Sequence, residues 1–217
     1  MLEALNAAGK IIQTHQTSAG ALRIVVESGV AMAPHCAHTG RSRIAEATIQ
    51  LMIQRKFYCG TQWGLLTDKQ LQQVRDHSFP GSDRDNGKPD IDYSVENAVR
   101  LIKAGIPQLV STDAGTIDPD VAKDFGPEGG PGGLGGHASL IGEAEFIDMQ
   151  AMQQRGMTPM MILQAATRNI AAAYHKLDAF GTLEAGKLAD LIVVDADPLA
   201  DIQNLRKQSM VVKEGRT

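Results

Sequence analysis

The hydrophobic positions of the chain form short apolar runs that alternate with segments of helical spacing. Four apolar runs predict strands, and each is followed along the chain by a segment with the periodicity or capping residues of a helix. The expected strands are 10–15, 30–35, 57–62 and 108–112. The expected helices are 18–29, 41–56, 67–77, 94–105, 138–156 and 158–176. Strand-then-helix units in succession predict a parallel β/α architecture.

Polar residues and glycines mark where these helices begin and end. A hydroxyl side chain before a helical segment is a favoured N-cap, and a glycine after it is a favoured stop. Proline is tolerated at the first helical position, which suits Pro159. The expected N-caps are Ser18, Thr67, Ser94 and Thr158, and the expected stops are Gly29, Gly105 and Gly156.

The chain changes character after the last expected helix. Leu191–Val194 is an apolar run after a glycine-containing turn, and 209–216 offers one more strand. These two strands predict a small β element after the helices. The boundary between the two parts is expected near residue 176.

A glycine-rich segment follows the fourth expected strand. The stretch DFGPEGGPGGLGGH, residues 124–137, holds seven glycines and two prolines. It predicts a loop with two open interpretations, a plain linker or a lid over an active site. Loops after strand ends carry function in β/α folds, which is the basis of the second interpretation.

Composition narrows the range of partners. The chain has 217 residues, 43% of them hydrophobic, which is enough for one core or for one domain with a small appendage. Lys and Arg number 21 and Asp and Glu 25, giving a net charge of −4, so we expect no nucleic-acid partner. No stretch approaches the roughly 20 apolar residues of a membrane span, so we expect no membrane partner.

The N-terminus and the cysteines favour a cytoplasmic location. The first residues, MLEALNAAGK, lack the basic start and apolar run of a signal peptide, and any signal peptide would precede Met1. Cys36 and Cys59 can pair or stay free. We expect free thiols in a reducing compartment.

Three of the four expected strands end on a residue that can bind a metal, namely His15, His35 and Asp113. The carboxyl ends of the strands of a parallel β/α barrel meet on one face, so residues far apart in sequence converge there. Two imidazoles and a carboxylate suit a divalent metal such as zinc. Such an ion lowers the pKa of bound water to about 7 and polarises a carbonyl, and a neighbouring carboxylate can accept the proton.

The other histidines and two glutamates carry weaker signals. Cys36 and His38 lie beside His35, but a structural zinc site needs four ligands at known spacings, so we interpret them as loop residues. His137 follows the glycine-rich segment and is either the first residue of a helix or a substrate contact. We expect His77 and His175 at the surface. Glu143 and Glu145 are expected either on the surface of a helix or next to the site, where they would support its residues from outside.

Several longer stretches resemble the metal-dependent amidohydrolase superfamily. MTPMMILQAATRNIAAAY followed by GTLEAGKLADLIVVDADPLADI is similar to its final barrel helices and the strands of its small β-sandwich. STDAG resembles its eighth-strand motif, and THQTSAGALRIVVESGVAMAPHC resembles its fifth and sixth strands. Within the superfamily the pattern is most similar to imidazolonepropionase-like and Xaa-Pro dipeptidase-like members.

This resemblance implies roles for particular residues. His15 resembles the fifth-strand metal ligand, and His35 the sixth-strand ligand or polarising residue. Asp113 would bind metal and act as the general base, and His137 would contact substrate. The implied cofactor is a divalent metal, most simply zinc, as one or two ions. The implied reaction is hydrolysis of a carbon–nitrogen bond in a small molecule, as in an amide, a dipeptide or a cyclic amide.

The resemblance covers only part of the superfamily pattern. These enzymes open with a His-x-His pair on the first strand, and the chain contains no such pair. A complete barrel needs roughly 250 residues. We therefore expect an α/β fold comprising the C-terminal half of a TIM-like (β/α)8 barrel, strands 5–8 with their helices, over 1–176. Residues 177–217 would form part of a small β-sandwich.

Half a barrel exposes two sheet edges and an apolar interior. We therefore expect it to pair with a missing N-terminal half or with a second copy of itself. Whether this part of an enzyme is active alone is open. The alternatives are a deaminase of the same superfamily and a non-catalytic half-barrel module that binds no metal.

Overall fold

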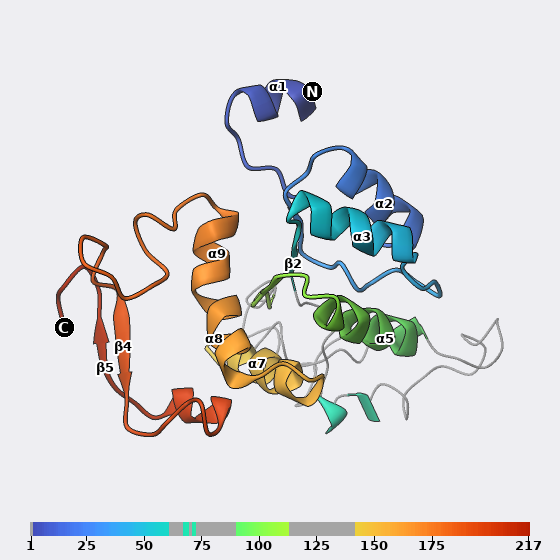
Figure 1. Cartoon of the computed structure of the whole chain (residues 1–217). Coiled ribbons are helices and arrows are strands. Elements are labelled where there is room, and N and C mark those ends of the chain that lie inside the picture. The colour runs from blue at the N-terminus through green and yellow to red at the C-terminus, as the bar shows by residue number, and fades with distance from the viewer. Residues whose placement is uncertain (1, 61–66, 70, 73–89, 113–141) are drawn as a thin grey trace, which may run out of the picture.

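A parallel sheet whose strands follow chain order organises the first half of the protein (Figure 1). The computed structural model describes residues 2–60, 67–69, 71–72, 90–112 and 142–217. Its sheet contains β1 (Met32–Ala33), β2 (Tyr58–Gly60) and β3 (Gln108–Leu109), in that spatial order. Gln13 extends the sheet beyond β1 through an isolated parallel bridge to Met32. The four expected strands are therefore neighbours in parallel, although each is shorter than the apolar pattern indicated.

The two faces of this sheet pack against different helices. Ala33 and Cys59 are paired across β1 and β2, and they belong to a buried cluster with residues of the flanking helices. Met32 and Leu109 belong instead to a cluster with Ala173, near the C-terminal end of the last helix. This division follows from the alternation of side chains along a strand. One face is therefore packed against the connecting helices, and the other packs in part against Ala173.

Three connecting helices lie along the first face (Figure 1). They are α2 (Ala19–Glu27), α3 (Glu46–Arg55) and α5 (Asp90–Lys103). The expected cap of α2 is confirmed, because Ser18 Oγ accepts a hydrogen bond from the backbone N–H of Ala21 at 3.1 Å. A short helix, α1 (Leu2–Ala7), precedes the sheet. Residues 68–69 and 71–72, in the expected helix 67–77, are helical.

The start expected for α5 was wrong. The helix begins at Asp90, and Ser94 is one turn inside it with 1% of its surface exposed. Ser94 is therefore a buried residue of the helix and not its cap. The preceding residues extend the helix, and Asp92 places a negative charge near the N-terminal end, where the helix dipole favours it.

The expected helix 158–176 is two helices, α8 (Pro159–Ala166) and α9 (Arg168–Ala173). Thr158 caps α8 as expected, since its hydroxyl accepts the backbone N–H of Met161 at 3.3 Å. The break lies at Thr167, whose backbone leaves helical geometry at φ −134° and ψ −86°. Its hydroxyl donates to the carbonyl of Leu163 at 2.6 Å. Such a side-chain bond to the preceding turn bends or interrupts a helix.

The C-terminal part is a two-stranded antiparallel hairpin, and a 3-10 turn in the connection between its strands packs against the helices. The hairpin contains β4 (Leu191–Val194) and β5 (Gln208–Val212), with η2 (Ile202–Arg206) between them. Ile202 and Leu205 of η2 are buried in one cluster with residues of α8 and of α7 (Ala144–Gln154). The hairpin stands at one side of the molecule (Figure 1), and apolar side chains of both its strands are exposed.

An ion pair joins the two outer ends of this hairpin. The ammonium group of Lys213, just after β5, donates to the carboxylate of Asp190, just before β4. The backbone N–H of Glu214 donates to the other carboxylate oxygen at 2.8 Å. These hydrogen bonds lower the pKa of Asp190, and the bond to Asp190 raises the pKa of Lys213. The turn after β5 is thereby fixed to the start of β4.

The expectation of free cysteines was wrong, because Cys36 and Cys59 form a disulfide. Their Cα atoms lie 5.5 Å apart, within the range that a disulfide spans. Parallel pairing of β1 with β2 brings the residues together across 23 positions of sequence. The argument from free thiols to a reducing compartment therefore no longer holds.

This pairing predicts the thiol content of the protein. Unfolded in denaturant without a reductant, the chain should not react with a thiol reagent, and after reduction it should expose both cysteines. Measuring the mass of the alkylated chain with and without prior reduction checks this. Alkylation of the unreduced chain would contradict the disulfide.

Among the helices that the structure describes, none has the length and apolar character needed to cross a lipid bilayer.

Candidate functional site

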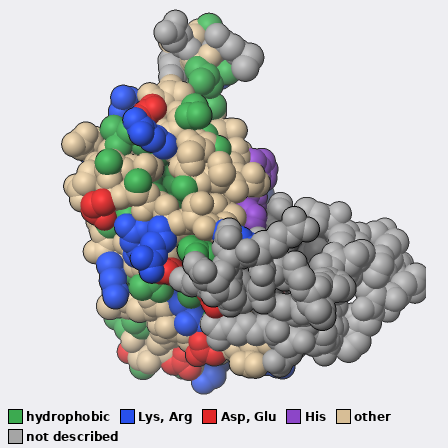
Figure 2. Space-filling view, turned by 90° about the vertical axis from the view of Figure 1, so that its right-hand side faces the viewer, with side chains coloured by type: hydrophobic (Ala, Val, Ile, Leu, Met, Phe, Trp, Pro, Cys, Tyr) green, Lys and Arg blue, Asp and Glu red, His purple; other side chains and the backbone are tan. Residues whose placement is uncertain are grey.

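Two of the residues singled out in the sequence lie side by side where neighbouring strands end. His15 follows the bridge residue Gln13, and His35 follows β1. The centroids of their imidazole rings are 4.6 Å apart, with 34° between the ring planes. His35 is 7% exposed, whereas His15 is exposed to solvent. Figure 2 shows histidine side chains reaching the surface on one face of the molecule.

The other two predicted site residues, Asp113 and His137, lie outside the described residues, as does the glycine-rich segment. Asp113 directly follows Thr112, which is described and partly buried. The end of β3 is held by the last helices. The backbone N–H of Val110 donates to the carbonyl of Ala165 at 3.2 Å, and the Asn169 amide donates to the carbonyl of Gln108 at 3.1 Å.

The backbone at His35 forms a tight turn. The N–H of His38 donates to the carbonyl of His35 at 3.0 Å, and the neighbouring Cys36 is fixed to β2 by the disulfide. The Gln16 amide also donates to the His35 carbonyl, at 2.5 Å. Sequence reasoning missed Gln16. Its position beside His15 was the one signal that could have drawn attention to it.

The segment that leaves this turn is fixed to α5 by Asn97, which has no exposed surface. Its amide nitrogen donates to the hydroxyl of Thr39 at 2.7 Å and to the carbonyl of Ser42 at 2.9 Å. Its amide oxygen accepts the backbone N–H of Ile44 at 2.9 Å. The side-chain amide of Asn97 can form four hydrogen bonds, and it forms three of them within this loop. The loop after His35 is thus a defined structure and not a loose connection.

The described donors suit a metal but do not complete its site. In a tetrahedral zinc site two nitrogens each about 2.0–2.1 Å from the ion are separated by roughly 3.3 Å. The ring centroids of His15 and His35 lie 4.6 Å apart. Catalytic zinc sites use three protein ligands. Within the described ranges no cluster of three His, Cys, Asp or Glu residues is present. A third ligand would have to come from elsewhere in the protein.

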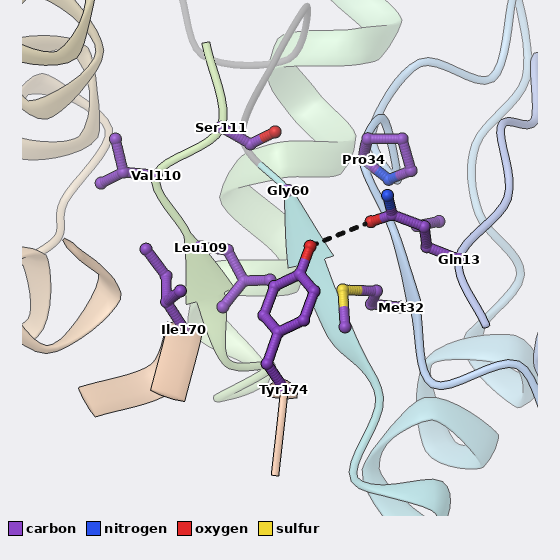
Figure 3. Close-up of a pocket in the computed structure, with 10 residues that line it drawn as sticks. Gln13, Met32, Pro34, Gly60, Leu109, Val110, Ser111, Ile170 and Tyr174 are labelled. Atoms are coloured by element: carbon purple, nitrogen blue, oxygen red, sulfur yellow. Dashed lines mark hydrogen bonds between the residues drawn. The ribbon is translucent and has the colours of Figure 1, made fainter. Parts of the chain in front are cut away.

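A small pocket lies on the sheet face that carries Met32 and Leu109 (Figure 3). Its volume is about 180 Å³. Two of its lining side chains are joined, because the hydroxyl of Tyr174, which follows α9, donates to Gln13 Oε1 at 3.4 Å. Ser111 adds a second hydroxyl beside the end of β3. The remaining lining is mostly apolar and contains Met32, Ala33, Pro34, Gly60, Leu109, Val110 and Ile170.

The surface predictions for two other residues agree with the structure. His175 is exposed, in a left-handed backbone conformation with φ 53°. Glu143 is exposed and pairs with Arg206 at 2.5 Å. Glu145 is partly buried in the first turn of α7. His77 lies outside the described residues.

Comparison with known proteins gives a match over the whole chain. The model of the Amidohydrolase family matches residues 1–217. The imidazolonepropionase of Shouchella clausii (strain KSM-K16) is 31% identical over 123 residues, which cover 55% of this chain and 23% of that protein.

Solved structures give similar matches. Molinate hydrolase is 36% identical with a TM-score of 0.83, and phenylurea hydrolase B is 30% identical with a TM-score of 0.76. Each alignment covers 99% of this chain and 44% of the other. A Xaa-Pro dipeptidase, 22% identical with a TM-score of 0.66 and 46% of its length covered, shares the fold. The chain thus spans less than half the length of each of these proteins.

Proposed function

This chain belongs to the amidohydrolase family, and from this we propose that it forms the C-terminal half of a metal-dependent hydrolase of carbon–nitrogen bonds. The parallel sheet, running in chain order from Gln13 to β3, supports an assignment to strands 5–8 of a (β/α)8 barrel. The C-terminal hairpin would be part of a small β-sandwich. The sheet face that carries Met32 and Leu109, with its pocket, would then face strands from an N-terminal half or a second copy.

The observation that carries this proposal is the contact between the His15 and His35 rings at the ends of neighbouring parallel strands. Nothing in local structure requires two imidazoles to meet there. Parallel strand ends are where β/α barrels collect their catalytic groups. A pair of neutral imidazoles is also a common part of zinc sites.

In the proposed site His15, His35 and Asp113 would hold the metal. Bound there, a divalent ion such as zinc would supply water of lowered pKa and a Lewis acid for the substrate carbonyl. Asp113, which follows Thr112 in the sequence, would accept the proton of the attacking water. His35 would orient the carbonyl oxygen if it is not itself a ligand, and His137 would contact the substrate. One or two ions remain equally compatible with these residues.

The relatives support a substrate with a carbonyl bonded to nitrogen. Two solved structures at 30% identity or more are called molinate hydrolase and phenylurea hydrolase B. We therefore propose a small neutral amide, urea or related compound ahead of a dipeptide.

The test uses the protein that carries this chain, together with its upstream half. It should purify with about one or two divalent ions per chain and hydrolyse a phenylurea, a cyclic amide or a dipeptide. The variants His15→Gln and His35→Gln should lose the metal. The variant His175→Gln should keep it, because His175 is exposed and is not one of the proposed ligands. Elemental analysis and product release provide the two measurements.

Each alternative has its own outcome in this test. Protein that binds no divalent metal would favour a non-catalytic module. Release of ammonia from nucleobase analogues, without cleavage of ureas, amides or peptides, would favour a deaminase.

A further inference from the structure

Gln16 lies directly after His15 and is buried, with 4% of its surface exposed. Buried glutamine is uncommon, because its amide loses water on folding and must find partners inside the protein. Residues on either side of it, His15 and Thr17, are exposed. The side chain of Gln16 is therefore directed into the protein at the point where the chain leaves the sheet.

The amide nitrogen of Gln16 donates to the backbone carbonyl of His35 at 2.5 Å. This hydrogen bond joins the chain segments that follow two neighbouring strand positions, 19 residues apart in sequence. The same carbonyl accepts the N–H of His38 at 3.0 Å, so both lone pairs of the His35 oxygen are used. The backbone of His35 is thereby held from its own turn and from the segment that carries His15.

The other end of the amide makes no comparable contribution to folding. Gln16 Oε1 is buried and accepts no hydrogen bond from any residue that the structure describes. A methionine would fill the same volume without burying an amide. The glutamine is thus poorly explained by packing alone, and its donated bond to His35 is the interaction that distinguishes it.

We propose that Gln16 is a positioning residue that fixes the His35 backbone against the segment bearing His15 and so holds the two imidazoles in contact. That this arrangement serves metal binding rests on the proposed function, in which both rings bind the metal. The geometric role stands on the contacts alone. Residues that orient metal ligands commonly change metal affinity by 10- to 100-fold when they are replaced.

The experiment compares Gln16→Met with Gln50→Met in the protein that carries this chain. Methionine keeps the length of the side chain and removes the donor. Gln50 is a matched control, because it is exposed on α3 and, among the residues that the structure describes, its side-chain amide bonds only Glu46, at 2.9 Å. The first readout is the set of nuclear Overhauser contacts between the His15 and His35 ring protons in metal-free protein. The second is zinc affinity, with the visible spectrum of bound cobalt as a report on ligand geometry.

We expect Gln16→Met to lose the ring contacts, to bind zinc about 10- to 100-fold more weakly and to change the cobalt spectrum. Gln50→Met should match the unmodified protein in all three. A folded Gln16→Met with unchanged ring contacts and affinity would overturn the proposal. If Gln16→Met does not fold, Gln16→Leu takes its place, since leucine is apolar and smaller and cannot donate.

The two proposals fail in different ways. Unmodified protein that binds no metal would refute the proposed function, while the ring contacts in metal-free protein would still decide the role of Gln16. Failure of both Gln16 variants to fold would also overturn the positioning role, because the side chain would then be needed for folding itself.

Discussion

Replacing Asp113 by asparagine should lower kcat by about 10²- to 10⁴-fold, the usual contribution of a general base. Asparagine keeps the shape of the side chain but cannot accept the proton of the attacking water, and it carries no charge to balance a metal. The fold should change little, so far-UV circular dichroism and the melting temperature should match the unmodified protein. Steady-state kinetics measure kcat with whichever of the phenylurea, the cyclic amide and the dipeptide is hydrolysed fastest.

The matched control for this variant is Asp195→Asn. Asp195 is exposed beside the end of β4, and its backbone N–H bonds the carbonyl of Lys207 at 2.8 Å. Its carboxylate has no role in the proposed chemistry, so its replacement should leave kcat unchanged. An Asp113→Asn protein with undiminished kcat would remove Asp113 from the mechanism, whatever the metal content.

Adding one methyl group at Gly60 should be the most destabilising of the small changes open to the sheet. A Cβ at this position would lie 2.5 Å from the carbonyl oxygen of Pro34 and 2.7 Å from its Cα. Both are backbone atoms next to His35, so no side-chain rotation can make room. We expect Gly60→Ala to lower the free energy of unfolding by about 3 kcal/mol, the upper range for overpacking. For a chain of this size that corresponds to a fall of roughly 6–12 °C in the melting temperature.

Gly20→Ala provides the comparison, since a Cβ there meets nothing within 4 Å. Gly20 lies in α2, where alanine is favoured over glycine by roughly 0.5–1 kcal/mol. Thermal unfolding should therefore separate the two variants in opposite directions. Equal stability of Gly60→Ala and the unmodified protein would mean that β1 and β2 approach each other less closely at Pro34 than described.

The sequence was informative wherever a signal is local. Ser18 and Thr158 were recognised as caps because capping depends on a side chain and a backbone N–H three residues away. The parallel β/α architecture followed from the alternation of apolar runs and helices. Ser94 misled because it has the composition of a cap and lies inside a longer helix. Thr167 interrupts a segment whose periodicity continues on both sides.

The features that escaped prediction depend on contacts between distant segments. The pairing of Cys36 with Cys59 requires β1 and β2 to be adjacent in one register, which composition does not specify. Gln16 is informative only because its amide meets a carbonyl 19 residues away. The candidate site was predicted as a set of strand ends. Which backbone groups hold those ends in place could be seen only in three dimensions.

The 3-10 turn η2 has a consequence for how such a protein can be altered by recombination. Arg206 pairs with Glu143 and lies over the Phe146 ring, with the guanidinium carbon 4.4 Å from the ring centroid. Gln203 donates to the carbonyl of Phe146 at 2.9 Å. In a chimera of two related proteins with its junction at residue 177, α7 would come from one parent and η2 from the other, so these contacts would join residues that did not evolve together. An exchange upstream of Glu143 would inherit both together, so we expect viable chimeras to have their junctions there.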